Sequence, residues 1–222
     1  MRRYVMPPMR GTLRTRLLLN AFVEPSEAAS RLPEGLRPRV TRGGTLVGCC
    51  LLEIEDMRPG PFPARVGLGQ LAAAHRVAVE WDAATGTQSG VFVVGRCTNS
   101  RVAELAGGRL APGVFARAVI EKQADRWSVH GDGMDIEATV KRLPAEGSEV
   151  CDADAGMCIH ADVGVSVGRG GALESAVMVP STRSAIALDN VAFESSFIRG
   201  FASARPARSY LMRDVEVVWS RA

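Results

Sequence analysis

The sequence predicts a mainly antiparallel β or α+β domain whose sheet curves and closes toward a barrel, with a few peripheral helices. Most segments between turn signals alternate apolar and polar residues, which is the period of a strand, and they greatly outnumber helical segments. Short turns rich in Gly, Asp and Pro join them, as in hairpins. A length of 222 residues with 46% hydrophobic content favours one large domain over residues 1–222.

The first half of the chain predicts strands interrupted by one helix and one loop. Pro25 is suited to the first turn of a helix, and Gly43-Gly44 and Thr85-Gly86 are suited to hairpin turns. Three prolines between residues 58 and 63 predict a loop, because proline cannot donate to a strand ladder. The expected elements are a strand over 12–23, a helix over 25–31, a hairpin of 37–40 with 45–54, the loop over 58–63, and a hairpin of 75–82 with 89–94.

The second half is organised around residues 107–117. Gly107-Gly108 ends a helix capped by Thr98 or Asn99, and Pro112-Gly113 makes a turn into a strand. A helix stop followed by an ordinary core strand also explains this stretch. The remaining expected elements are a strand bearing Val114, Ala116, Ala118 and Ile120 on one face, a hairpin of 127–130 with 134–140, a loop over 144–156, strands over 158–167, 173–179 and 210–219, and loop with some helix over 183–207.

Charge and composition argue against several classes of partner. The net charge of +3 comes from scattered basic residues, so no nucleic-acid partner is expected. Neither a signal peptide nor a run of 18 apolar residues is present, so we expect a cytoplasmic protein without a membrane partner. Five cysteines are an odd number and are expected to be reduced. A homo-oligomer is compatible with the sequence.

Five short motifs carry a resemblance to a known family. They are residues 17–25 (LLLNAFVEP), 32–36 (LPEGL), 77–82 (VAVEWD) and 90–93 (GVFV), and Gly108-Arg109 with Pro112-Gly113. In this order and spacing they resemble the acetoacetate decarboxylase-like superfamily, and more closely a bacterial branch of it. The resemblance covers most of the chain. It implies a cone-like β-barrel with peripheral helices and a deep pocket for a small molecule.

The resemblance also implies that the family reaction is missing. In the decarboxylases a Gly-Arg pair precedes a Gly-Phe-Pro-Lys-Lys run, whose first lysine forms a Schiff base with the β-keto acid. Matching Gly108-Arg109 and Gly113 to that pattern puts Ala116 at the nucleophilic lysine and Arg117 beside it. Alanine has no nucleophile and a guanidinium stays protonated, so neither can form an imine.

Only Lys122 and Lys141 are lysines in this sequence. Lys122 lies six residues after Ala116, or about 20 Å along a strand at roughly 3.3 Å per residue, and Lys141 lies in a separate hairpin. We therefore expect neither lysine to replace the family nucleophile, and no adduct with acetoacetate or pyruvate.

Candidate catalytic residues are two pairs of charged side chains. Arg76 and Glu80 share a face of their strand, where a carboxylate can act as acid or base and an arginine can bind an anionic substrate; a solvated strand face is the alternative. Arg96 ends a strand and Arg109 lies in the motif turn, where each could hold a carboxylate or bond to loop carbonyls. The candidate substrate-binding residues are Phe22, Phe62, Val114, Ala116 and Ala118, with Phe22 taken from the resemblance and Phe62 from the loop that we expect at the pocket mouth.

No metal and no cofactor are expected. Cys151, Cys158 and His160 form a C-x6-C-x-H pattern that matches no common zinc spacing. His75 and His130 have no nucleophile motif around them, and no phosphate-binding or dinucleotide motif is present.

The leading hypothesis is an enzyme that acts on a small organic acid or polyketide-like metabolite in an apolar pocket. Its chemistry would be of the lyase, cyclase or isomerase type, with acid–base or positioning steps and no Schiff base. A noncatalytic small-molecule-binding protein of the same fold is the alternative, and an interaction protein without a ligand is the third. Convergent ionisable groups in the pocket would favour the enzyme.

Overall fold

The computed structural model describes residues 7–107, 109, 113–131, 133–141 and 162–221, and most of its elements are β-strands. No helix in these residues is long and apolar enough to cross a membrane. In chain order the elements are β1 (Met9–Val23), α1 (Pro25–Ala29), β2 (Arg37–Pro38), β3 (Val40–Thr41), β4 (Gly44–Pro59), a 3-10 turn η1 (Ala64–Val66), β5 (Leu68–Ala83), β6 (Gly86–Thr98), α2 (Arg101–Ala106), β7 (Ala116–Gln123), β8 (Arg126–Gly131), β9 (Met134–Val140), β10 (Val163–Val167), β11 (Leu173–Pro180), β12 (Ile186–Leu188), β13 (Val191–Ser195), α4 (Ser196–Arg199), β14 (Arg205–Pro206) and β15 (Ser209–Arg221).

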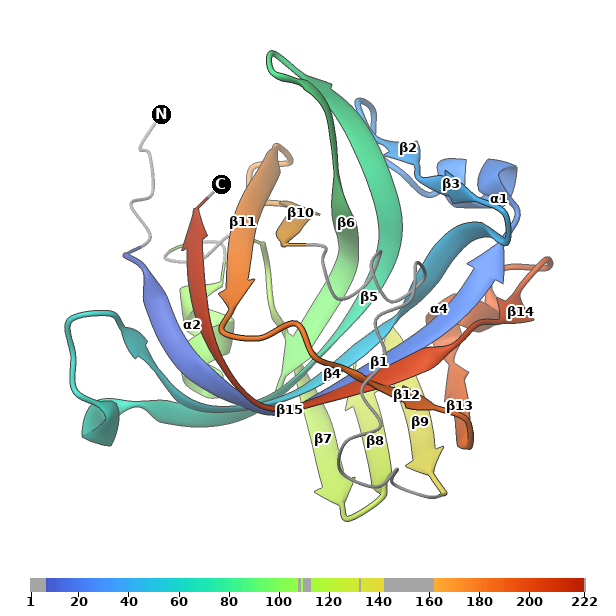
Figure 1. The fold of residues 1–222 in the computed structure, drawn as a ribbon. Helices are drawn as coiled ribbons and strands as arrows, with labels where there is room; N and C mark the ends of the chain where they lie inside the picture. Colours follow the sequence, from blue (N-terminus) through green and yellow to red (C-terminus); the bar gives the residue numbers. More distant parts are fainter. Residues whose placement is uncertain (1–6, 108, 110–112, 132, 142–161, 222) are drawn as a thin grey trace.

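Seven of the described strands pair in a closed ring. The order around it is β1, β4, β5, β6, β10, β11 and β15, which pairs again with β1. All neighbours are antiparallel except β6 and β10. In Figure 1, β1, β4 and β15 cross the middle of the view, with β10, β11 and the upper parts of β5 and β6 above them.

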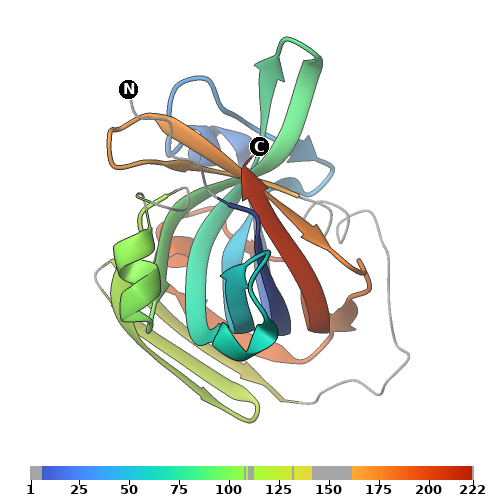
Figure 2. The same ribbon diagram turned by 90° about the vertical axis from the view of Figure 1, so that its left-hand side faces the viewer.

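A second sheet of β7, β8, β9 and β13 extends from the ring at a fork in β6. Val91 and Phe92 of β6 pair with β10, whereas Cys97 and Thr98 pair in parallel with the start of β7. The rest of this sheet is antiparallel. Figure 2 shows its strands β7, β8 and β9 in yellow-green at one side of the ring strands, with α2 beside them.

The ring strands β1, β4 and β5 bury both faces. Leu17 and Leu19 of β1 face the second sheet, while Leu18 between them faces the opposite way, into the ring. We call the apolar side chains between the ring and the second sheet the outer cluster: Leu17, Leu19, Cys49, Leu51, Ala73, Cys97, Ala118, Ile120, Trp127, Val129, Met134, Ile136, Ala138, Val140, Leu188 and Leu211. Those on the inner face form the ring cluster: Leu13, Leu18, Leu46, Cys50, Ile54, Ala78, Ala185, Tyr210, Met212, Val215 and Val217.

The helices cover the upper part of the outer face. Ala28 of α1 and Phe197 of α4 pack against Val77 of β5 and its neighbours in a third cluster. The second sheet covers the lower part of the same face (Figure 1). Because these elements lie outside the ring, the opposite face of β1, β4 and β5 is the ring interior.

Several predicted elements are confirmed. The strand over 12–23 lies within β1, the hairpin of 75–82 with 89–94 is β5 with β6, and the hairpin of 127–130 with 134–140 is β8 with β9. The helix before Gly107 is also confirmed, but its cap is Ser100, whose hydroxyl accepts from the Ala103 N–H.

Other expectations are corrected. β2 pairs with β5 rather than with β4, and only Val40 and Thr41 form the expected hairpin about Gly43-Gly44. β4 continues to Pro59, where a missing N–H costs little at the end of a strand. Residues 183–207 contain β12, β13, α4 and β14 rather than mostly loop, because short strands carry too little periodicity to be recognised. The loop over 144–156, Gly108 and Pro112 lie outside the described residues.

Candidate functional site

Arg76 is a buried cation on the inner face of the ring. It belongs to β5, where a register shift follows His75 in the pairing with β6, and its side chain shares a face with Ala74 and Ala78. Only 5% of Arg76 is exposed. One contact of its guanidinium is a 2.6 Å hydrogen bond from Nη2 to Asn20 Oδ1. Because a guanidinium stays protonated, Arg76 places a positive charge on the inner face of the ring.

Asn20 is fixed so that its oxygen faces Arg76. Its Nδ2 donates to the Arg208 carbonyl at 2.7 Å, which leaves Oδ1 to accept from the guanidinium. The Asn20 side chain is completely buried. The β1 and β5 strands are not neighbours, so this contact has to cross β4.

Gly48 makes that crossing possible. It pairs with Asn20 on one side and with Arg76 on the other. A Cβ at Gly48 would lie 2.2 Å from the Leu19 carbonyl oxygen and 3.0 Å from Asn20 Oδ1. The absence of a side chain therefore lets Asn20 and Arg76 meet above the backbone of β4.

Arg16 is a second buried cation on the same face of β1. It is 6% exposed, and Nη1 lies 3.7 Å from the Met212 sulfur, in the ring cluster. A register shift at Arg14 gives Leu13 and Arg16 the same orientation as Leu18 and Asn20. We call Arg16, Asn20 and Arg76 the interior polar site.

Arg96 lies close to this site, at the fork of β6. It pairs across the strands with Ala74, and its guanidinium carbon lies 5.1 Å from the centre of the Phe115 ring. Burial lowers the pKa of Arg96 to about 10, while the charge of Glu174 acts in the opposite direction. Arg96 therefore remains a cation at neutral pH.

Of the other candidates, Glu80 and Phe22 lie on the inner face toward one end of the ring. The Glu80 carboxylate is one-third exposed and lies 3.9 Å from Arg37 and 3.8 Å from Arg39, so its recorded ion pairs are not with Arg76. Phe22 packs against the ring cluster, and its ring occupies the space next to Gly43. Both side chains therefore lie on the same face as Arg76, nearer to that end of the ring.

Three candidates lie elsewhere on the surface. Arg109 is exposed and donates to the Leu105 carbonyl at 2.8 Å, as a residue at a helix end commonly does. Phe62 is 54% exposed at the tip of the β4–β5 connection, and Val114 is 43% exposed before β7 begins. None of these three has a recorded contact with the interior polar site.

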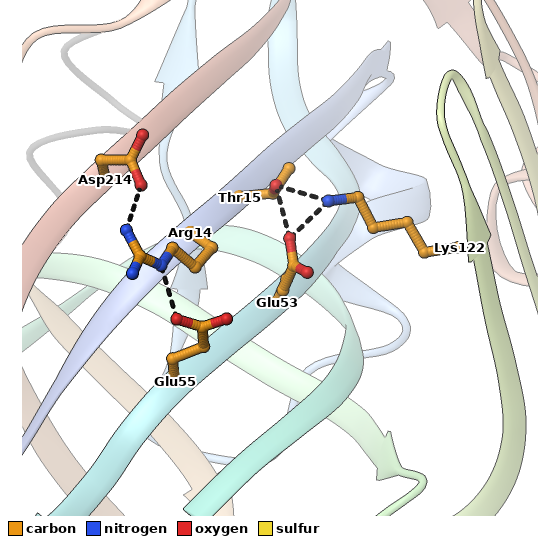
Figure 3. A network of polar contacts seen from close by, with 6 residues as sticks. All are labelled: Arg14, Thr15, Glu53, Glu55, Lys122 and Asp214. Atoms are coloured by element: carbon orange, nitrogen blue, oxygen red, sulfur yellow. Dashed lines mark hydrogen bonds and ion pairs between the residues drawn. The ribbon is translucent and has the colours of Figure 1, made fainter.

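The small residues of β7 face the outer cluster. Ala118 is buried there and Ala116 packs against it, while Arg117 points outward. Neither lysine lies on the inner face of the ring. Lys122 packs at the edge of the outer cluster, where Nζ donates to Thr15 at 3.0 Å and to Glu53 (Figure 3), and Lys141 is exposed.

Lys122 also lines a cavity of about 40 Å³, together with Trp127 and Leu211. This volume holds about three water molecules but no larger metabolite. The Glu53 carboxylate is partly buried, which opposes ionisation, yet the bonds from Lys122 and Thr15 lower its pKa overall. The Lys122 group thus acts as an ion pair that closes the edge of the outer cluster.

A further polar group, His75 with Ser195 and Cys49, is sealed on the outer face. The Ser195 hydroxyl lies 3.2 Å from His75 Nε2 and accepts from the Cys49 thiol at 3.2 Å. His75 also stacks on Phe197. Burial lowers the pKa of His75 to about 4 and raises that of the Cys49 thiol to about 12, so both are neutral and unreactive at neutral pH.

The structure records no metal-ligand cluster of three His, Cys, Asp or Glu side chains within the described part of the chain. Cys49, Cys50 and Cys97 are free thiols. The expectations for Cys151, Cys158 and His160 concern residues outside the described ranges.

Sequence reasoning missed Arg16 and Asn20. One signal was present: Asn20 interrupts the apolar run from Leu17 to Val23, and Arg16 comes directly before that run. Polar or charged residues are uncommon in a strand that is buried on both faces, so their presence there indicates a specific role. The register shift at Arg14 hid the shared face, because simple alternation puts Leu13 and Arg16 on opposite sides.

The ring, the second sheet and the few peripheral helices define the acetoacetate decarboxylase-like fold. The chain is similar to acetoacetate decarboxylase from Legionella pneumophila, with a TM-score of 0.63 and 12% identity over 100% of this chain and 88% of that one. It is also similar to an acetoacetate decarboxylase-like enzyme from Sphingomonas wittichii RW1, with a TM-score of 0.63 and 12% identity over 98% and 93% of the two chains.

A third similar structure is the enduracididine biosynthesis enzyme MppR complexed with pyruvate, with a TM-score of 0.64 and 10% identity over 97% of this chain and 88% of that one. No protein-family model matches the sequence, and no curated protein matches it by sequence. The likeness is therefore one of fold, and it agrees with the superfamily that the motifs resemble.

Proposed function

We propose that this protein is a small-molecule enzyme that binds a small organic acid inside the ring through Arg76 and acts on it without a Schiff base. The observation that carries the proposal is the buried Arg76 guanidinium, held by Asn20 across Gly48. A planar guanidinium on the inner face of the ring is well suited to bind a carboxylate through paired hydrogen bonds. Similar structures named as decarboxylases or solved with pyruvate support a carboxylate ligand of this size.

The chemistry that this site supports is positioning and stabilisation of negative charge. Arg76 would hold the substrate carboxylate, and Arg96 at the nearby fork would add positive potential where charge develops in the transition state. Glu80 is the candidate acid or base at the end of the same face. Lyase, cyclase and isomerase reactions of a 2-oxo or 3-oxo acid need such groups.

The position of both lysines supports the proposal that no Schiff base forms. Lys122 is engaged by Glu53 and Thr15 on the outer side of the sheet, and Lys141 is exposed. Ala116 and Ala118, which the motif match puts near the family lysine, also face the outer cluster. Neither lysine, both of which lie in the described part of the chain, reaches the ring interior to form an imine with a substrate held by Arg76.

The test measures binding of pyruvate and acetoacetate to the wild-type protein and to Arg76→Met. The control is Arg126→Met, an exposed arginine paired with Glu137 on β8 and β9. We expect Arg76→Met to weaken binding about 30-fold or more, the usual effect of truncating one member of a buried charge pair, and Arg126→Met to leave it unchanged.

Measurements of substrate turnover and of covalent trapping by borohydride complete the test. Mass spectrometry after borohydride treatment with either acid should show no adduct, and a stable adduct on Lys122 or Lys141 would restore the Schiff-base mechanism. Binding that depends on Arg76 with no conversion of any tested acid would support the noncatalytic alternative. Equal affinity of Arg76→Met and wild type for these acids would contradict the claim that Arg76 binds the carboxylate.

A further inference from the structure

β7 is an edge strand along most of its length. It pairs with β6 only at Ala116 and Arg117, because β6 ends at Thr98 and the chain continues into α2. From Ala118 to Gln123 it pairs with β8 on one side, and no strand in the described residues pairs with its other side. Figure 1 shows β7 as the outer strand of the lower sheet, next to β8 and then β9. Such an edge leaves a row of backbone N–H and C=O groups available to another strand.

A groove of about 460 Å³ follows this edge. The five consecutive residues 117–121 of β7 line it, together with Asn99 and His130. Successive side chains of a strand point to opposite faces, so a groove lined by consecutive residues reaches the backbone edge rather than one face alone. The edge of β7 is therefore open to a partner.

This edge lacks the usual protection against strand pairing. β2 and β14 each pair with a single strand, but they are two residues long and contain a proline, Pro38 and Pro206. β7 has eight residues, no proline and an unbroken register with β8. Its inward-pointing charge, Lys122, lies beyond the groove residues and is paired with Glu53. Because natural edge strands are commonly short, bulged or interrupted by proline, the length and regularity of β7 favour a strand partner.

The exposed charges of β7 differ from those of its neighbours. On the same face of the sheet, Arg126 of β8 pairs with Glu137 of β9. Arg117 and Glu121 of β7 are also exposed on that face, and neither has an ion pair among the described residues. Val119, midway between them, is 61% exposed. This row suits a neighbouring strand that presents a glutamate, an apolar residue and an arginine in the reverse order.

A second copy of β7 is such a strand when it runs antiparallel. With a twofold axis at Val119, Arg117 of each copy lies opposite the partner's Glu121, and the two Val119 side chains meet at the axis. A register shifted by two residues separates both charge pairs. A shift by four residues places two arginines or two glutamates opposite each other, so the charges select one register.

The inner face of β7 fits the same register. Ala118 lies opposite the partner's Ile120, and Lys122 lies opposite the partner's Ala116, a small residue that leaves space for the lysine stem. The pairing joins the second sheets of two copies into one continuous sheet. The paired strands belong to the second sheets, so the ring interior with Arg76 takes no part in the pairing.

We infer that the edge of β7 is an interaction surface and that its partner is β7 of a second copy of this chain, paired antiparallel about Val119. The interface is isologous, with backbone hydrogen bonds along the strands and an Arg117–Glu121 pair on each side of the axis. This inference goes beyond the proposed function and does not depend on it.

The test measures the mass of the protein by sedimentation across a range of concentrations. The chain has a mass of 23.7 kDa, and we expect a species of twice that mass. Arg117→Glu and Glu121→Arg each place like charges opposite one another and should weaken dimerisation about tenfold or more, since the twofold axis doubles every substitution. The double variant Arg117→Glu/Glu121→Arg restores opposite charges and should dimerise within about threefold of wild type.

The matched control is Arg126→Glu. It reverses an exposed charge on the same face of the same sheet, one strand away from the edge, and should dimerise as wild type does. Arg117, Glu121 and Arg126 are exposed, so these variants should fold, and urea unfolding checks that they do.

Val119→Cys tests the register directly. Opposed residues of an antiparallel pair have Cα atoms about 4.5–5.5 Å apart, within the range of a disulfide, so oxidation by diamide should give a covalent dimer. Val102→Cys, at an exposed position on α2, is the control and should stay uncrosslinked. Both variants carry Cys151→Ser and Cys158→Ser, because these two residues lie outside the described ranges, and the other cysteines are buried.

The outcomes separate this inference from the proposed function. Wild-type protein that keeps the mass of one chain at submillimolar concentration would overturn it, as would a dimer that Arg117→Glu leaves unchanged. A double variant that does not recover, or a disulfide that forms at Val102→Cys and not at Val119→Cys, would place the contact elsewhere and also overturn it. Pyruvate binding by the monomeric variants tests the proposed function separately.

Discussion

The two faces of β1, β4 and β5 are built from alternating residues of the same strands, yet they hold different kinds of side chain. The outer face is an almost wholly apolar cluster against the second sheet; its buried His75 is neutral, and the Lys122–Glu53 ion pair lies only at its edge. The inner face contains the charged Arg16 and Arg76 among apolar neighbours. This difference indicates that the outer face maintains the fold, and we propose that the inner face retains its charge to bind a ligand.

The largest expected effect is on the free energy of unfolding, and it comes from a substitution that disturbs only the outer face. Ile136 is fully buried in the outer cluster, and Ile136→Ala should lower the free energy of unfolding by about 2–5 kcal/mol through lost contacts and a cavity. Affinity for pyruvate should stay within about twofold of wild type at a temperature where the variant is folded. Urea unfolding and calorimetry measure the two quantities, and a parallel loss of affinity would show that the faces are not separable.

The next effect concerns His75 and acid. Because burial lowers the pKa of His75 to about 4, the unfolded chain binds a proton below its ordinary pKa of about 6.5 while the folded chain does not. Stability should therefore fall as the pH drops from about 6.5 to 4, by about 3 kcal/mol in total.

His75→Phe should lose this part of the acid dependence, although it also removes the hydrogen bond to Ser195 and lowers stability at neutral pH. Unfolding free energies of both proteins across that pH range measure the difference. Parallel curves would mean that the pKa of His75 is the same in the folded and unfolded protein, and would contradict this account.

A smaller change in stability with a large change in binding is expected at Asn20. Asn20→Ala leaves the Arg208 carbonyl and the Arg76 guanidinium without the amide, which should cost about 1–3 kcal/mol in the free energy of unfolding. Affinity for pyruvate should fall at least tenfold because Arg76 loses its fixed orientation. Retained affinity would show that Arg76 needs no support from β1.

The smallest effect is expected at the ion pair of Lys122 and Glu53. Lys122→Met should lower stability by less than about 1 kcal/mol at pH 7 and leave ligand affinity unchanged. Since the pKa of Glu53 is lowered, this contribution is present above the ordinary glutamate pKa and disappears as the pH falls through the folded value. A difference between the two proteins that persists in acid would contradict this assignment.

The sequence predicts the outer face better than the inner one, for a physical reason. Strands such as β8 and β9 follow strict alternation, so Trp127, Val129 and Ile136 can be assigned to a core from period alone. On the inner face, register shifts at Arg14 and after His75 change which residues share a side. Such shifts depend on pairing between strands distant in sequence.

The candidate site was predicted only in part for the same reason. Arg76 was recognised as a candidate from its strand, but its partner Asn20 lies 56 residues away and meets it only because Gly48 is between them. Glu80 was expected on the same strand face as Arg76, and its recorded ion pairs are with Arg37 and Arg39. A contact that spans three strands produces no recognisable pattern in the sequence.

The most direct test of the central claim is a crystal structure of the protein with pyruvate. We predict the ligand inside the ring, with its carboxylate within about 3 Å of the Arg76 guanidinium. A ligand bound on the other side of the sheet, beside Lys122 and Trp127, would contradict the claim that the inner face is the binding face.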